Sequence, residues 1–225
     1  MRKLIKGLHE FQCNYFSTHR EFFEQLTLGQ HPRILFITCS DSRIAPNLIT
    51  QTQPGELFII RNVGNIVPPY GSAGGEGAAI EYAIEGLGVR HIVVCGHSHC
   101  GAIKGLLQLG DLAEKMPLVY DWLKYAEATR RIIQENYQDY EEEALLNVAI
   151  EENVLVQIEN LRTYPVVAAK LYSGQLSIHA WVYKIETGRV VVYSAERCPI
   201  QAKHEDYSQE EVETTQAVQP VLGWD

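Results

Sequence analysis

Three residues with chemically useful side chains follow a predicted buried strand in the first quarter of the chain. Residues 33–37 form a short β-branched and aromatic run, typical of a strand inside a sheet. Cys39, Asp41 and Arg43 come directly after it. Because open α/β folds place their chemistry at the carboxyl edge of the sheet, we expect a thiol, an acid and a fixed cation to face one small space there.

A second set of potential ligands follows another predicted strand, at residues 91–95, where the chain runs into His97 and Cys100. Two strand ends in one parallel sheet would bring these residues to Cys39. Two thiolates and one imidazole suit Zn²⁺ and leave one tetrahedral position for water. Taken alone, the His-x-x-Cys spacing also fits a buried cysteine and a surface histidine. Combined with Cys-x-Asp-x-Arg at the first strand end, it predicts one zinc ion per chain.

Helical segments precede and follow these two strands. Residues 1–28 carry a helix-period apolar stripe that breaks near Ser17 and Thr18, so we expect a helical arm before the first strand. Residues 117–164 are predicted to be helical in two or three pieces. The arm is apolar enough that it must pack either on its own domain or on a partner subunit.

The end of the chain returns to strand-like patterns. Residues 176–184 and 189–193 alternate around a hairpin-like turn. The whole order predicts an α/β fold, a mainly parallel β-sheet flanked by helices, with an N-terminal helical arm and a C-terminal antiparallel addition. We expect a single domain over residues 1–198 and a C-terminal tail over residues 199–225.

Composition and charge argue against several other classes of protein. The formal net charge of −9 disfavours nucleic-acid binding, which needs a basic face. We expect no membrane span and no secretory signal, because the chain has neither a long apolar run nor a typical cleavage site. The five cysteines lack disulfide-like spacing, which fits a reducing compartment. Cys13, Cys95 and Cys198 are predicted to be small buried side chains.

Three motifs together resemble those of the β-class carbonic anhydrases. They are Cys-Ser-Asp-Ser-Arg at residues 39–43, Arg-Asn-Val-Gly-Asn at 61–65 and Gly-His-Ser-His-Cys-Gly at 96–101. The similarity extends over residues 20–200. It implies an enzyme that interconverts CO₂ and bicarbonate with Zn²⁺. It also implies a homodimer, or an assembly of dimers, in which the helical arm embraces a partner.

The resemblance also implies roles for individual residues. Cys39, His97 and Cys100 would be the zinc ligands, and zinc-bound hydroxide would attack the carbon of CO₂. Asp41 would accept a hydrogen bond from that hydroxide and so point a lone pair at the substrate. Arg43 would pair with Asp41 and keep it ionised.

Further residues match positions that contact substrate in this family: Gln30, Phe58, Val63, Tyr82 and Gly101. In similar members the glutamine, the phenylalanine and the tyrosine reach the site across the dimer interface. Without the resemblance, Gln30 fits a polar residue at a loop end and Tyr82 fits core packing. Phe36 stands where members with a switchable site usually carry tryptophan, so Phe36 and Gln30 favour the always-open class.

Two other functions and two locations stay open at this point. Relatives with the same ligands hydrolyse carbonyl sulfide or carbon disulfide, and a scaffold protein could keep a structural zinc without turnover. The intact Asp41 and Arg43 argue against the scaffold. The chain looks like the cyanobacterial carboxysomal branch, which implies location in the carboxysome, a shell scaffold protein as partner and supply of CO₂ for carbon fixation. The cytoplasm is the alternative location.

Overall fold

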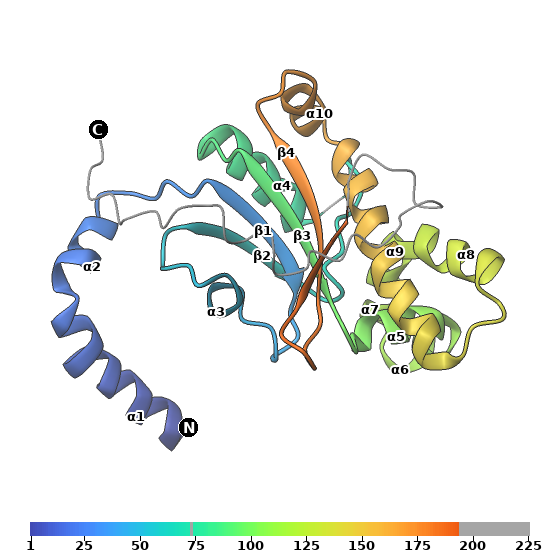
Figure 1. Ribbon diagram of the computed structural model, residues 1–225, viewed down its shortest axis with the longest axis horizontal. Helices are drawn as coiled ribbons and strands as arrows, with labels where there is room; N and C mark the ends of the chain where they lie inside the picture. Colours follow the sequence, from blue (N-terminus) through green and yellow to red (C-terminus); the bar gives the residue numbers. More distant parts are fainter. Residues whose placement is uncertain (73, 194–225) are drawn as a thin grey trace, which may run out of the picture.

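The computed structural model describes residues 1–72 and 74–193, which contain one five-stranded sheet (Figure 1). Its strands are β1 (Ile34–Cys39), β2 (Leu57–Asn62), β3 (His91–His97), β4 (Ser177–Tyr183) and β5 (Val190–Tyr193). Their order is β2-β1-β3-β4-β5, with parallel pairing up to β4 and antiparallel pairing of β4 with β5. The predicted mainly parallel sheet with an antiparallel addition is confirmed.

The helices lie before, between and after these strands. The α-helices of the described residues are α1 (Arg2–Glu10), α2 (Arg20–Leu26), α3 (Pro46–Thr50), α4 (Gly75–Glu81), α5 (Gly101–Leu107), α6 (Leu112–Lys115), α7 (Pro117–Leu123), α8 (Glu127–Asn136), α9 (Glu142–Arg162) and α10 (Pro165–Tyr172). Short π-helical segments follow α1 and α4, at Phe11–Phe16 and Tyr82–Gly86. Proline opens α3, α7 and α10, where its missing N–H costs nothing. The predicted helical block corresponds to α7, α8 and α9.

The main core lies between one face of the sheet and the helices that cover it. Alternate residues of the central strands, such as Leu35, Ile37 and Ile92, point into this core because strand side chains alternate between faces. Helix α9 packs directly on β3 and β4. Gly96 permits this close approach, since a Cβ there would lie 2.8 Å from Cγ2 of Val154.

The opposite face of the sheet carries a smaller apolar cluster. Phe36, Val93 and Cys95 are buried in it. The ring of Phe36 meets the ring of Trp181 edge-on, with 6.0 Å between the centroids. Cys95 is therefore a small buried side chain, as predicted.

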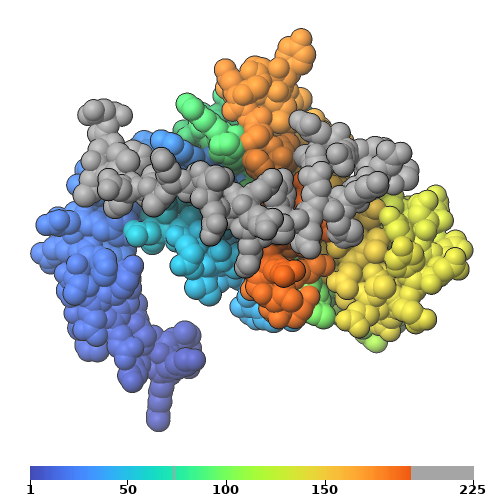
Figure 2. Space-filling view, in the orientation of Figure 1, coloured from blue at the N-terminus to red at the C-terminus, as the bar shows by residue number. Residues whose placement is uncertain are grey.

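The N-terminal arm, formed by α1, the π-helical segment Phe11–Phe16 and α2, projects away from the sheet (Figures 1 and 2). This confirms the predicted helical arm. Several of its large apolar side chains are exposed: Leu4, Ile5, Leu8, Phe11 and Tyr15. The prediction that Cys13 is buried is wrong, because the arm does not fold back over that residue.

Two expectations concern parts that the structure does not describe. Cys198 and the predicted tail at residues 199–225 lie outside the described residues. Among the described helices, none combines the length and the apolar character needed to cross a bilayer.

Candidate metal centre

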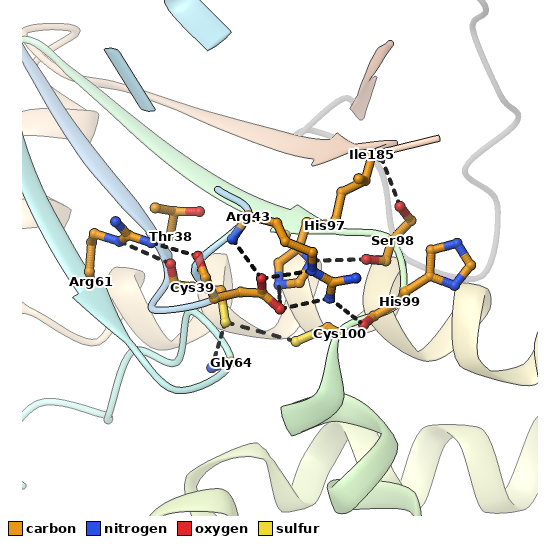
Figure 3. A network of polar contacts seen from close by, with 12 residues as sticks. Thr38, Cys39, Arg43, Arg61, Gly64, His97, Ser98, His99, Cys100 and Ile185 are labelled. Atoms are coloured by element: carbon orange, nitrogen blue, oxygen red, sulfur yellow. Dashed lines mark hydrogen bonds and ion pairs between the residues drawn. The ribbon is translucent and has the colours of Figure 1, made fainter. Parts of the chain in front are cut away.

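Two strand ends meet at the carboxyl edge of the sheet and bring the three predicted ligands together (Figure 3). Cys39 ends β1 and His97 ends β3. The two strands are parallel neighbours with Thr38 opposite Cys95, so their ends lie side by side. Cys100 precedes α5. The potential ligand atoms of Cys39, His97 and Cys100 all lie within 4.8 Å of one another, and all three residues are buried.

The two thiols of this cluster differ in acidity. Their sulfur atoms lie 4.0 Å apart. The contact with the Cys100 thiol and the N–H of Gly64 lower the pKa of Cys39 well below its usual value, although burial opposes this. The contact with Cys39, together with burial, raises the pKa of Cys100. One thiolate is therefore favoured in the protein alone, and a cation between the sulfurs would favour two.

His97 presents a free lone pair to the same space. Its Nδ1 lies 2.9 Å from the carbonyl oxygen of Ser98. Since a carbonyl only accepts, Nδ1 carries a hydrogen, and in the neutral imidazole the lone pair is therefore on Nε2. Within the described part of the chain, this buried Nε2 has no hydrogen-bond partner.

The spacing of the donors fits a tetrahedral zinc site. With Zn–S bonds of about 2.3 Å, two sulfur ligands lie roughly 3.8 Å apart. The observed separation of 4.0 Å between the sulfurs of Cys39 and Cys100 agrees with this. The unpartnered Nε2 of His97 supplies the third donor, and two sulfurs with one imidazole nitrogen are a donor set that zinc prefers.

An ionised carboxylate lies beside the cluster. Asp41 receives two hydrogen bonds from the guanidinium of Arg43, at 2.9 Å from Nε and 2.8 Å from Nη2, and a third from the backbone N–H of Arg43 at 3.0 Å. This guanidinium contact holds the pKa of Asp41 far below its ordinary range. The Oδ2 atom of Asp41 is 3.8 Å from Nε2 of His97. Arg61 ties the loop in place by donating to the carbonyls of Cys39 and Asp41, at 3.2 and 2.8 Å.

A row of amides on α9 holds the loop that follows β2. Asn153 donates to the carbonyl of Gly64 at 3.1 Å. The N–H of Val67 donates to Gln157 at 2.9 Å, and Asn160 donates to the carbonyl of Val67 at 2.9 Å. This row positions the Gly64 N–H that contacts Cys39. Sequence reasoning missed it, although amides at i, i+4 and i+7 of an apolar helix share one face and could have indicated it.

Comparison with known proteins decides the family. The family model for carbonic anhydrase matches residues 34–190, which include the whole cluster. A solved β-carbonic anhydrase named CcaA is 60% identical to this chain, with a TM-score of 0.85, over 86% of this chain and 95% of that one. The chain belongs to the β-carbonic anhydrase family. The predicted enzyme class, carbonic anhydrase, is thereby confirmed.

Further carbonic anhydrases show the same similarity. The one from Synechococcus elongatus is 60% identical over 195 residues, covering 86% of this chain and 72% of that protein. The one from Synechocystis sp. is 61% identical over 194 residues, covering 86% and 71%. One of two tetrameric β-carbonic anhydrases solved from Sordaria macrospora is 30% identical, with a TM-score of 0.75, over 85% of this chain and 95% of that one.

Two of the predicted substrate-contacting residues of this carbonic anhydrase lie next to the cluster. Val63 directly precedes Gly64, and its side chain is partly exposed. Its carbonyl accepts a hydrogen bond from Nε1 of Trp122 at 2.8 Å, so α7 fixes its position. Gly101 follows Cys100 and opens α5.

The other three lie towards the amino edge of the sheet. Phe58 pairs with Leu35, four residues before the end of β1, which is about 13 Å along the strand from the metal edge. The ring of Tyr82 packs against Phe58 with 6.0 Å between the centroids. Tyr82 is 52% exposed, so the core-packing interpretation of this residue is wrong. Gln30 is exposed in the segment before β1, and within one chain it is not brought to the cluster.

Proposed function

We propose that this carbonic anhydrase hydrates CO₂ reversibly to bicarbonate and a proton at the centre formed by Cys39, His97 and Cys100, with one zinc ion per chain. The observation that carries this proposal is the buried Nε2 of His97, which has no hydrogen-bond partner among the described residues. It lies beside two sulfur atoms and 3.8 Å from the carboxylate of Asp41. A buried lone pair without a donor is costly unless a ligand takes it.

Soft thiolates and a borderline imidazole favour zinc over hard cations such as Mg²⁺ or Ca²⁺. When bound, zinc would supply a Lewis acid that makes water acidic enough to serve as a nucleophile near neutral pH. Cys39 is prepared for it, because the Gly64 N–H at 3.4 Å favours the thiolate.

The chain's own residues orient the reacting water. Asp41 is ionised and can only accept, so it holds the O–H of the water and leaves an oxygen lone pair facing CO₂. Arg43 occupies both carboxylate oxygens and fixes the direction of that acceptor. The new C–O bond converts CO₂ and water into bicarbonate, and the proton leaves to solvent.

We also propose that the chain acts as a homodimer or an assembly of dimers, in which Gln30, Phe58 and Tyr82 of one chain complete the centre of another. Their position towards the amino edge, far from their own metal edge, supports this. The exposed apolar side chains of the arm, Leu4 and Ile5 among them, need a partner to cover them. The relative from Sordaria macrospora is described as tetrameric.

For the cellular role, we propose supply of CO₂ for carbon fixation in the carboxysome, with a shell scaffold protein as partner. The support is the 60% and 61% identity to carbonic anhydrases of two cyanobacteria. A fluorescent fusion expressed in a cyanobacterium tests it: foci that coincide with a carboxysome marker are expected, and diffuse cytoplasmic signal would refute it.

Zinc analysis combined with stopped-flow CO₂ hydration tests the reaction. We expect the chain to carry zinc and to hydrate CO₂. Cys39→Ala should lose both the metal and the activity. Asp41→Asn should keep zinc but lose at least about 100-fold in rate, because the water is no longer held correctly. Cys95→Ala is the matched control, since Cys95 is a buried cysteine on the other face of the sheet.

Three results would contradict the proposal. Zinc without CO₂ hydration would favour a structural metal. Hydrolysis of carbonyl sulfide or carbon disulfide without CO₂ hydration would favour the alternative hydrolase. Equal zinc content in Cys39→Ala and Cys95→Ala would show that the metal binds elsewhere.

A further inference from the structure

Ser98 lies between two of the proposed metal ligands and is fully buried. Its N–H donates to the carbonyl of Tyr183 at 2.9 Å. Its hydroxyl accepts the N–H of Ile185 at 2.9 Å and donates to the carboxylate of Glu186 at 2.6 Å (Figure 3 shows the first of these). Its carbonyl accepts Nδ1–H of His97 at 2.9 Å. The end of β4 and the turn after it therefore hold the peptide that orients the imidazole.

The next residue connects the same turn to the carboxylate pair. His99 has a left-handed backbone with φ of 56°, which few residues other than glycine adopt. Its carbonyl accepts a hydrogen bond from Nη2 of Arg43 at 3.1 Å (Figure 3). Its Nε2 lies 3.6 Å from Oε2 of Glu186. Such a conformation persists only where neighbouring contacts hold it.

Glu186 reaches both residues from the turn between β4 and β5. Its side chain is 49% exposed, so packing does not force it towards Ser98. The hydrogen bond from the Ser98 hydroxyl lowers the pKa of Glu186 below its ordinary value, and the group is ionised near neutral pH. An ionised acceptor makes a stronger hydrogen bond than a neutral one.

We propose that Glu186 is a positioning residue of the metal centre, acting through the Ser98 hydroxyl. By holding Ser98, it fixes the carbonyl that orients His97. By the same restraint on the loop, it fixes the carbonyl of His99, which accepts a hydrogen bond from Arg43. The inference rests on the proposed function, because it takes His97 as a zinc ligand and Arg43 as the partner of the catalytic carboxylate.

Loss of this acceptor would leave the buried hydroxyl of Ser98 without its strongest partner. The loop would then relax, and the imidazole of His97 would be held less firmly towards the metal. Changes to outer partners of metal ligands typically cost about 10- to 100-fold in metal affinity or activity. The side chain of Glu186 contacts Ser98 and His99, and neither is one of the proposed substrate-contacting residues, so the cost should fall on turnover and metal retention and not on substrate binding.

Four variants of the zinc-loaded chain test the proposal, by the rate of zinc loss to an excess of chelator and by kcat and KM for CO₂ hydration. Glu186→Ala should lose zinc about 10- to 100-fold faster and lower kcat by a similar factor, with KM unchanged. Glu186→Gln keeps an oxygen that accepts from Ser98, although a neutral and weaker acceptor, and should fall between wild type and Glu186→Ala. Glu142→Ala is the control, because Glu142 is an exposed carboxylate paired with Lys104 at 2.8 Å. Ser98→Ala should be at least as defective as Glu186→Ala, because it also removes the acceptor of the Ile185 N–H.

The double variant with Ser98→Ala and Glu186→Ala sharpens the test. If Glu186 acts through Ser98, the double variant equals Ser98→Ala alone, because the two losses are one interaction. Additive losses would overturn the proposal, as would Glu186→Ala behaving like the control. If Glu186→Gln is as defective as Glu186→Ala, the effect comes from the negative charge facing His99 and not from the acceptor for Ser98. That result would also overturn the proposal. If the wild-type chain holds zinc but does not hydrate CO₂, the proposed function is refuted. The role of Glu186 is still tested in that case, because the rate of zinc loss can be measured without activity.

Discussion

Replacing Asn153 with leucine should destabilise the protein although the two side chains have similar volumes. Asn153 is fully buried on α9. It donates to the carbonyl of Gly64 at 3.1 Å and accepts from Nε2 of Gln157 at 2.9 Å. It also accepts from the hydroxyl of Thr129 at 3.4 Å, a longer and weaker contact. Leucine can make none of these bonds.

The size of the stability loss in Asn153→Leu follows from the buried polar groups that lose their hydrogen-bond partner. Gly64 and Gln157 each keep a buried polar group that loses its partner, at about 1–3 kcal/mol apiece. The hydroxyl of Thr129 loses only a long contact of 3.4 Å, which adds little. Burial of the leucine side chain returns about 1–2 kcal/mol. The difference is a net loss of about 0–5 kcal/mol, centred at about 2.5 kcal/mol, and that central value corresponds to a fall in Tm of about 5–10 °C for a chain of this size.

Urea unfolding of the zinc-loaded protein at one fixed chain concentration measures this loss, because both metal and association change apparent stability. The matched control is Asn136→Leu, whose exposed amide donates to the carbonyl of Ile132 at 2.9 Å. The control should change stability by less than about 0.5 kcal/mol. Equal unfolding midpoints for Asn153→Leu and Asn136→Leu would refute the reasoning. Asn153→Leu should also lose zinc faster, since the Gly64 N–H no longer faces Cys39 firmly.

Three further predictions concern pH, packing and the metal. Burial raises the pKa of Glu152, so the native state binds more protons than the unfolded state, and stability falls as pH rises from the ordinary pKa towards the raised one. Glu152→Gln should therefore be more stable than wild type at pH 8, with a smaller difference at pH 5, in urea unfolding. Gly96→Ala should cost about 1–3 kcal/mol by pressing on Val154, and thermal unfolding should show partial recovery when Val154→Ala is added. Chelation of the metal should lower the Tm of wild type but not of Cys39→Ala, by calorimetry.

Local patterns were enough to predict the edge of the sheet and its chemistry. Cys39 and His97 each end a strand whose apolar run is continuous in the sequence, and parallel strands place such ends at one edge. Asp41 and Arg43 are two positions apart, so their contact needs only a turn. The same kind of reasoning failed for Cys13, because an apolar helical stripe predicts burial without saying which surface provides it.

The sequence by itself therefore determined which residues could bind a metal or act in catalysis. It also determined the order of helices and strands. Only the tertiary structure decided what holds the centre in shape. Asn153 meets Gly64 across 89 positions of sequence, and Glu186 meets Ser98 across 88. The position of Phe58 far from the metal edge likewise depends on strand register. Periodicity reports which face of an element is apolar, whereas contacts between distant elements depend on how those faces pack, which no single segment encodes.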